Sequence, residues 1–462
     1  IYQKIRLVNF LRLGKELGSD DQWKTDDQLL RPVLPDDALL CVLEDDDDDK
    51  DCDSDRQGKS SGWDDGDASW QEKYTQLLQE FAQYKASVRD SFAKANDLSA
   101  SELMAPTAAV AGEKDDGGEP PMDYYFSSYA DTEIHEIMLK DQVRTQAYRD
   151  AVYDSKHLFE GKTVLDVGCG TGILSMFCAR AGAARVYAVD NSSIILKARE
   201  IAAENGLGPD RITFLRGRIE DLLKTEPLAG VHVDYIISEW MGYFLLFEGM
   251  LDSVIRARDV LAAANPGVKM LPASSRIHVA ALSHEEMMND SYHYWNNVYG
   301  FSMTPMKPGF IRTARVTYID ARRHAEEGDP VVVSDSACVK CIDMDKDTVA
   351  SLDFAAPFTL TMEASGRVHG LIAWFDVEFA PGGVSFTTSP HAEYTHWKQT
   401  CFILEDGGVE ACAGDQICGT LRCEKSADNE RELVVTITYS VKPAATGSPD
   451  GPETRTQTWL VA

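Results

Sequence analysis

The sequence has few basic residues, no long apolar run and no cysteine framework. Its 462 residues include 45 Lys and Arg against 75 Asp and Glu, a formal net charge of −30. This balance disfavours nucleic acid as the main ligand, because a phosphate backbone demands cations, whereas basic protein segments would be attracted. No signal peptide and no apolar stretch of membrane length occurs. We therefore expect no membrane partner and a cytoplasmic location.

The ten cysteines are scattered along the chain, without disulfide-like spacing. The pair Cys338-x-x-Cys341 stands alone, whereas a zinc site needs a second pair of ligands. We therefore expect this pair to be structural and expect no metal site. Cys169 and Cys178 fall in expected core elements, where cysteine behaves as a small apolar residue.

A glycine-rich stretch, VLDVGCGTG at 164–172, is the strongest local pattern. Its apolar start predicts a buried parallel strand, and glycines at alternate positions permit a tight turn close to a ligand. Helix-forming residues follow at 173–181, and Gly182 is a helix stop signal. Strand, glycine loop and helix together are typical of a doubly wound sheet that binds its ligand at the carboxyl ends of the strands.

The next predicted strand, 185–190, ends in Asp190, where such folds place an acid that accepts hydrogen bonds from ribose hydroxyls. Three interpretations are open. A dinucleotide would place its pyrophosphate at the loop, and a tight turn could also bind nothing. The third rests on the G-x-G-x-G pattern with Asp166 two residues before Gly168. That pattern resembles the S-adenosylmethionine site of class I methyltransferases.

Two acids follow a third predicted strand. Strand 233–238 leads to Glu239 at the same sheet edge, and a short aromatic loop returns Glu248 towards it. Two carboxylates among aromatic side chains predict a cation site with apolar walls; these side chains are Trp240, Tyr243, Phe244 and Phe247. The simpler alternative is one helix-capping acid and one solvated acid.

Over residues 122–462 the chain resembles the protein arginine N-methyltransferases. The resemblance rests on SEWMGY with its second glutamate (238–248), on THW followed by KQT (395–400), and on the segment 125–144. It implies methyl transfer from S-adenosyl-L-methionine to arginine guanidinium groups of proteins, leaving S-adenosyl-L-homocysteine. Met138 implies monomethyl and asymmetric dimethyl arginine as products. The alternatives are a small-molecule class I methyltransferase and an acidic scaffold that binds basic segments.

The resemblance also assigns residues to roles. A guanidinium stays protonated, and two carboxylates can hold it through charge-assisted hydrogen bonds. The expected catalytic residues are Glu239, Glu248, His396 and Asp141, with His396 paired to Asp141 as a proton acceptor or a structural strut. The expected cofactor-binding residues are His135, Met138, Arg144, Asp166, Gly168, Gly170, Asp190, Ile219 and Glu220. The expected substrate-binding residues are Tyr129, Met241 and Trp397.

The predicted fold class is α/β followed by β: a Rossmann-like methyltransferase domain, then an antiparallel β-barrel or sandwich with a helical arm. The expected segments are an acidic region at 1–65, an amphipathic helix at 66–97, a linker at 98–121, the methyltransferase domain at 122–270, and the β domain at 271–462 with its arm at 287–312. The acidic region is a solvated tail or binds a basic partner. The helix forms a coiled coil or packs within the protein.

The arm is rich in aromatic residues, which suits an interface anchor, although an internal helical hairpin is the alternative. The resemblance implies a homodimer through this arm. It further implies substrates with arginine in Gly- and Arg-rich segments, and suggests a ribosomal protein among them. Any Cys2His2 zinc finger would precede Ile1.

Overall fold

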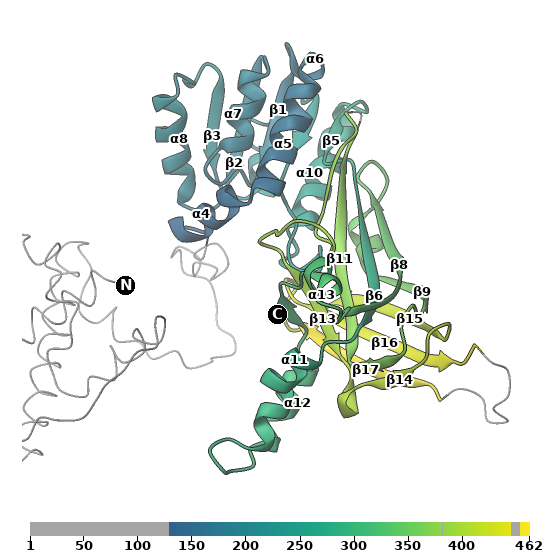
Figure 1. Cartoon of the computed structure of the whole chain (residues 1–462). Coiled ribbons are helices and arrows are strands. Elements are labelled where there is room, and N and C mark those ends of the chain that lie inside the picture. The colour runs from purple at the N-terminus through teal and green to yellow at the C-terminus, as the bar shows by residue number, and fades with distance from the viewer. Residues whose placement is uncertain (1–128, 381, 445–452) are drawn as a thin grey trace, which may run out of the picture. The chain divides into compact units, whose positions relative to one another are not determined.

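The computed structural model describes residues 129–380, 382–444 and 453–462 (Figure 1). The expectations for 1–65, 66–97 and 98–121 lie outside the described residues, as do Tyr125 and Phe126. The chain divides into two compact units, Ile1–Asp115 and Asp116–Ala462. All that follows concerns the second unit.

The first half of this unit is built on a five-stranded parallel sheet in the order β3-β2-β1-β4-β5. Its strands are β1 (Thr163–Val167), β2 (Arg185–Asp190), β3 (Ile212–Arg216), β4 (Tyr235–Ile237) and β5 (Lys269–Leu271). The strand order reverses between β1 and β4, which is where ligands bind in such sheets.

The helices of this half precede and connect these strands, and α7 and α8 link β1 to β2 and β2 to β3 (Figure 1). They are α4 (Thr132–Lys140), α5 (Gln142–Asp154), α6 (Lys156–Phe159), α7 (Ile173–Arg180), α8 (Ile194–Glu204), α9 (Ile219–Leu222) and α10 (Met250–Ala264). Within the described part of the chain, none of the helices is long and apolar enough to cross a membrane.

The predicted glycine loop lies between β1 and α7. Gly168 and Gly172 have φ of 74° and 80°, in the left-handed region that favours glycine. A Cβ on Gly168 would lie 2.2 Å from Met250 Cε, and one on Gly172 would lie 3.2 Å from the Phe214 ring. The loop therefore needs glycine both for its turn and for close approach by neighbours.

Asp166 on β1 is a fully buried acid. One of its oxygens accepts a 2.6 Å hydrogen bond from Ser175 Oγ of α7, and the other has no partner. The pKa of Asp166 is raised to about 7 by burial and by the charge of Asp190, against the lowering effect of the Ser175 hydrogen bond. This carboxyl group is therefore partly protonated near neutral pH.

The segment before the glycine strand forms two helices, where the sequence predicts a mostly helical stretch at 123–154. Asp141 separates them: it ends α4 with an extended backbone and caps α5 by accepting a 3.0 Å hydrogen bond from Arg144 N. This break turns α4 away from the axis of α5.

The second half consists of antiparallel sheets, which confirms the predicted β architecture. One sheet has the order β7-β13-β11-β6-β8 with β12 beside β11, another has β17-β16-β15-β9, and β10 pairs with β14. The strands are β6 (Ser274–Leu282), β7 (Arg315–Thr317), β8 (Val332–Asp343), β9 (Phe354–Thr361), β10 (Gly366–Val368), β11 (Gly370–Phe379), β12 (Val384–Thr387), β13 (Gln399–Ile403), β14 (Val409–Ala411), β15 (Gln416–Lys425), β16 (Leu433–Lys442) and β17 (Arg455–Val461).

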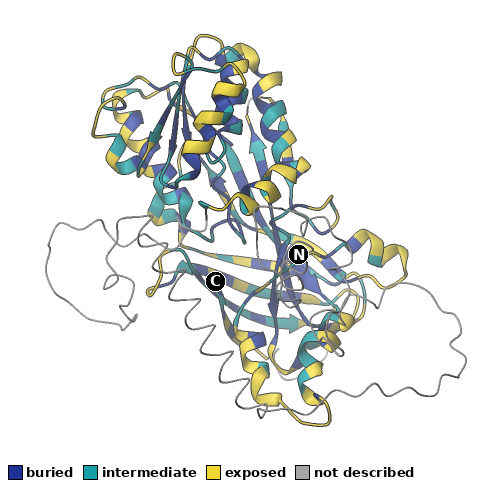
Figure 2. Ribbon diagram, turned by 90° about the vertical axis from the view of Figure 1, so that its left-hand side faces the viewer, coloured by how far each residue is buried: buried dark blue, intermediate teal, exposed yellow. Residues whose placement is uncertain are grey.

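One hydrophobic core cluster runs through both halves (Figure 2), and a second, smaller cluster includes Met288, Phe310 and Ile311 at the base of the arm. Tyr148 of α5 packs its ring edge-on against Phe379 of β11, with centroids 4.8 Å apart. Arg258 of α10 is buried, and it donates hydrogen bonds to the carbonyl oxygens of Met344 (2.6 Å) and Asp347 (2.7 Å) after β8. The two halves are therefore joined by apolar packing and by one buried cation.

The predicted arm projects from the β half (Figure 1). It contains α11 (Glu285–Met287), η4 (Met288–Tyr292), η5 (His293–Asn296), η6 (Thr304–Met306) and α12 (Lys307–Arg312). Its base is buried through Met288, Phe310 and Ile311. At its tip, Val298 and Phe301 exchange backbone hydrogen bonds around Tyr299 and Gly300, both at positive φ, as in a tight primed turn.

Replacing Arg258 with alanine tests the buried link between the halves. The change leaves two buried carbonyl groups without donors, so we expect the free energy of unfolding to fall by about 1–3 kcal/mol. Urea unfolding of the whole chain measures it. Arg256→Ala on the same helix is the control; Arg256 is exposed and forms a surface ion pair with Asp252, so its loss should cost less than about 1 kcal/mol. Equal losses for the two variants would contradict this role of Arg258.

Replacing Asp166 with asparagine tests the proton on the buried acid. Between about pH 4 and pH 7 the folded protein keeps this proton while the unfolded chain loses it, so wild-type stability falls as the pH rises. Asp166→Asn has no such proton. From pH 5 to pH 8 we expect the wild type to lose about 2–3 kcal/mol relative to the variant. Unfolding curves at both pH values measure this, and a pH-independent difference would contradict it.

Candidate active site

A cavity of about 550 Å³ lies at the carboxyl ends of β1, β2 and β4. The glycine loop and α4 contribute to its wall, and so does the β half, through the loop around His396 and the turn at 428–431. The topology predicts a ligand site at this sheet edge. The cavity is therefore built by segments from both halves of the unit.

Glu239 follows β4 and forms a nearly buried ion pair with Arg144 of α5. Arg144 donates from Nε (3.0 Å) and Nη2 (2.8 Å) to one oxygen of Glu239, and from Nη1 to the carbonyl oxygen of Met138 (3.2 Å). The other Glu239 oxygen accepts a hydrogen bond from Met241 N at 3.1 Å. Several charge-assisted bonds thus compensate the burial of both charges.

Glu248 lies in a left-handed backbone conformation, with φ of 76°. Its Oε2 accepts a 2.7 Å hydrogen bond from the Tyr129 hydroxyl. Its backbone N donates to the carbonyl oxygen of Arg431 (2.8 Å), and Arg431 Nη1 donates back to its carbonyl oxygen (3.4 Å). The turn between β15 and β16 therefore supports a backbone conformation that is unusual for glutamate.

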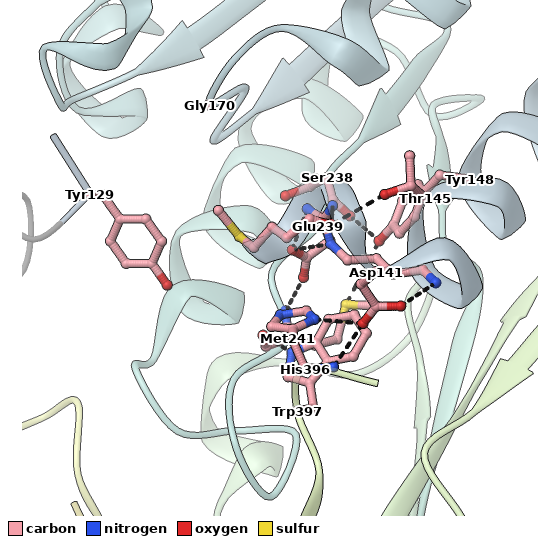
Figure 3. Close-up of polar contacts among 12 residues, drawn as sticks. Tyr129, Asp141, Thr145, Tyr148, Gly170, Ser238, Glu239, Met241, His396 and Trp397 are labelled. Carbon is pink, nitrogen blue, oxygen red and sulfur yellow. Dashed lines mark hydrogen bonds and ion pairs between the residues drawn. The ribbon is translucent and has the colours of Figure 1, made fainter. Parts of the chain in front are cut away.

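Asp141 and His396 pair as predicted. Asp141 Oδ2 contacts His396 Nδ1 at 2.7 Å and accepts from His396 N at 2.8 Å (Figure 3). Burial alone would raise the pKa of Asp141, but hydrogen bonds from His396 and Arg144 outweigh it and lower that pKa. The neighbouring Trp397 donates from Nε1 to the Met241 carbonyl oxygen at 2.8 Å. This loop of the β half is therefore tied to α5 and to the Glu239 loop.

At the other end of the cavity, two acids lie where a nucleoside would need acceptors. Asp190 accepts 2.8 Å hydrogen bonds from Gly170 N and Ser192 N, and Glu220 accepts one of 2.6 Å from Ser253 Oγ. Gly170 also approaches the His135 ring so closely that a Cβ would lie 3.3 Å from it. These groups fit S-adenosyl-L-methionine. The two acids can accept hydrogen bonds from hydroxyl and amino groups of the cofactor, the glycine loop leaves room for it, and the Arg144 cation can bind its carboxylate.

Most of the predicted site residues line this cavity. They are Tyr129, His135, Met138, Arg144, Gly168, Gly170, Asp190, Ile219, Glu220, Glu239, Met241, Glu248, His396 and Trp397. Asp141 and Asp166 do not line it. Asp141 acts on the cavity through His396 and the cap of α5, and Asp166 points into the core towards Ser175 because a fully buried carboxyl group needs that hydroxyl partner.

The sequence predicts four aromatic side chains around the two acids, and the prediction is wrong for two of them. Trp240 and Tyr243 line the cavity, but Phe244 and Phe247 do not. Phe244 packs edge-on against Phe402 of β13 in the core, and Phe247 stacks on Tyr243. Phe244 and Leu245 have φ of 49° and 66°. These left-handed residues redirect the loop, which the sequence pattern could not indicate.

Several lining residues are absent from the prediction. Met250, Ser253 and Arg256 belong to the first two turns of α10, and a fourth group comes from the turn 428–431. The residues of α10 could have been found from helical periodicity. Positions 250 and 253 lie on one face of a helix that begins shortly after Glu248 in the sequence. The turn carries no local signal, since Asp, Asn and Glu are ordinary turn residues.

Two family models match the chain. Residues 164–261 match one described as "Methyltransferase domain", and residues 273–444 match one described as "Arginine methyltransferase oligomerization subdomain". The two matches fall on the parallel-sheet half and the antiparallel half, respectively.

Named relatives and solved structures agree. The chain is 43% identical to protein arginine N-methyltransferase 1 of Schizosaccharomyces pombe, over 71% of this chain and 92% of that protein. It is 36% identical to ribosomal protein arginine N-methyltransferase rmt3 of the same yeast, over 96% of this chain and 81% of that protein. It also resembles the Trypanosoma brucei PRMT1 enzyme-prozyme heterotetrameric complex with AdoHcy, with a TM-score of 0.65 and 35% identity over 72% of this chain and all of that one. By its cavity, its fold and these relatives, the chain belongs to the protein arginine N-methyltransferases.

Proposed function

We propose that this enzyme stops at monomethyl and asymmetric dimethyl arginine, with S-adenosyl-L-methionine as methyl donor. The observation that carries the proposal is one cavity that joins Glu239 and Glu248 to a nucleoside-like end at Asp190 and Glu220. Met138 lines that cavity beside Arg144. Its place in the lining supports a pocket that admits a second methyl group on the same nitrogen and excludes the symmetric product.

Glu239 and Glu248 are proposed to hold the substrate guanidinium. Paired charge-assisted hydrogen bonds would draw positive charge away from the attacking nitrogen and fix its direction. Full deprotonation before attack is not required, because the proton can leave during or after methyl transfer. The cofactor supplies a methyl group that is activated by its positively charged sulfur.

Arg144 is proposed to contact both the catalytic acid Glu239 and the cofactor. Its guanidinium already orients Glu239, and its place at the cavity wall suits it to receive the carboxylate of the cofactor's amino-acid tail. His135, Ile219, Gly168 and Gly170 would surround the same ligand. Tyr129, Met241 and Trp397 are proposed to contact the substrate arginine.

His396 and Asp141 are proposed as a positioning pair. Asp141 binds both the backbone and the ring of His396 while it caps α5. Through this carboxylate, the β half would hold the junction of α4 and α5 beside the cavity. A proton-accepting role for His396 is the alternative, and a change in the pH profile of an Asp141→Asn variant would separate the two roles.

Basic segments of proteins are the proposed substrates, with Gly- and Arg-rich segments and a ribosomal protein among them. The net charge of −30 would attract such segments. The relative named a ribosomal protein arginine N-methyltransferase matches 96% of this chain. A cytoplasmic location is proposed with it, where newly made ribosomal proteins would be met.

We also propose a homodimer formed through the arm. The tip exposes Tyr299 (96% exposed) and Phe301 (71% exposed), and large exposed aromatic residues are typical anchors of an interface. The family model that matches residues 273–444 is described as an oligomerization subdomain. The similar PRMT1 structure from Trypanosoma brucei is a heterotetrameric complex.

Mass spectrometry of a methylated Gly- and Arg-rich peptide tests the product. We expect monomethyl arginine first and asymmetric dimethyl arginine later, distinguished by fragmentation. Glu248→Gln should lower turnover by on the order of 100- to 1,000-fold, because it removes one charged partner of the guanidinium. Its affinity for S-adenosyl-L-homocysteine, measured by calorimetry, should stay within about threefold, less than 1 kcal/mol.

The control is Glu204→Gln, an exposed acid at the end of α8 that makes the same change of charge. It should leave turnover unchanged. Symmetric dimethyl arginine as the only dimethylated product would contradict the proposed specificity. Full activity of Glu248→Gln would contradict the proposed clamp and would favour a scaffold role or another site.

Replacing Tyr299 and Phe301 together with alanine tests the arm. Loss of two interface anchors should weaken the dimer by at least about 30-fold, or about 2 kcal/mol. Sedimentation over a range of protein concentrations measures this. Tyr318→Ala removes an exposed tyrosine outside the arm and is the control. An unchanged monomer–dimer equilibrium in the double variant would contradict an interface at the tip.

A further inference from the structure

The Cys338–Cys341 pair lies at a β-bulge between β8 and β6. The ladder pairs Arg276 with Cys341 and Ile277 with Lys340, but then His278 with Cys338. Val339 is thus an extra residue on β8 without a partner of its own on β6. The bulge decides how the two cysteines lie relative to each other.

In a regular strand, residues three apart point to opposite faces and lie about 10 Å apart along the chain. Here the partners of the two cysteines, Arg276 and His278, are only two residues apart on β6. The bulge therefore places Cys338 and Cys341 on one face, with a separation along the strand of about 6.6 Å between Cα atoms. Disulfides span up to about 6.8 Å between Cα atoms.

The side chains meet this requirement too. The two Sγ atoms are 3.5 Å apart, and both cysteines are exposed and free. The sequence predicts a structural role for this pair, but neither cysteine is buried in the core. Although Cys338 is exposed as a residue, partial burial of its sulfur atom raises its pKa, and the contact with Cys341 adds a smaller increase; the pKa is about 11. Cys341 pairs across the ladder with Arg276, whose guanidinium forms an ion pair with Glu378.

We propose that Cys338 and Cys341 form a reversible dithiol–disulfide site that exchanges with a small-molecule disulfide such as oxidised glutathione. Cys341 Sγ, as the thiolate, attacks one sulfur of glutathione disulfide; that S–S bond breaks, and one glutathione thiolate leaves. Cys338 then loses its proton and attacks Cys341 Sγ, which releases the second glutathione. Two protein thiols are oxidised, one disulfide is reduced, and both cysteine protons pass to the two glutathiones.

Lys340 between the two cysteines makes the product easy to identify. Trypsin cuts after Lys340, so Cys338 and Cys341 fall on different peptides, 324–340 and 341–346. The whole native chain is incubated with oxidised glutathione, alkylated, digested and analysed by mass spectrometry. We expect the two peptides to be joined by a disulfide and to separate after reduction with dithiothreitol. Within the described residues Cys412 is exposed and forms no disulfide, so it should carry only glutathione or the alkyl group.

Cys338→Ser provides the matched variant. Cys341 should then keep its glutathione, because no second sulfur can displace it. The proposal is overturned if wild-type Cys341 accumulates glutathione to the same extent as in the variant. It is also overturned if both cysteines stay alkylatable under conditions in which Cys412 is modified.

Discussion

The buried ion pair between Arg144 of α5 and Glu239 after β4 links the segments on which the cavity depends. Removing one partner of such a pair costs about 3–5 kcal/mol, because the other charge stays buried. Both oxygens of Glu239 are engaged, one by Arg144 and one by Met241 N. The carbonyl oxygen of Met241 in turn accepts a hydrogen bond from the indole Nε1 of Trp397 in the β half. One chain of hydrogen bonds therefore runs from α5, through the glutamate loop, to the antiparallel sheets.

The two glutamates of the cavity are held by different means. Glu239 is held by Arg144 of its own half, whereas Glu248 is held by Tyr129 and by both the backbone and the guanidinium group of Arg431, 183 residues further along the chain. The left-handed backbone of Glu248 costs free energy, on the order of 1–3 kcal/mol. Such strain persists where the surroundings determine the conformation more strongly than the residue prefers, and the turn at 428–431 supplies that constraint.

Sequence patterns predicted the parts of the site that depend on short-range spacing. The glycine loop, Asp190 after its strand and the two glutamates follow from strand ends that meet at one sheet edge. A cofactor-binding role for Asp166 stays a prediction, because the same strand pattern fits an acid turned to the ligand or to the core; in the structure its side chain contacts Ser175 and does not line the cavity. The turn at 428–431 was missed because its contact with Glu248 exists only after the two halves have packed together.

The shared cavity wall has a consequence for how this protein can be divided. A fragment that ended after β5 would keep the glycine loop, Asp190 and both glutamates, yet it would lack His396, Trp397 and the support of Arg431. Such a fragment would retain Arg144 and Tyr129, which contact the two acids, while losing the contacts of Trp397 with Met241 and of Arg431 with Glu248. Gene fusion or shuffling at the boundary after Leu271 would therefore divide the wall of this cavity between two polypeptides.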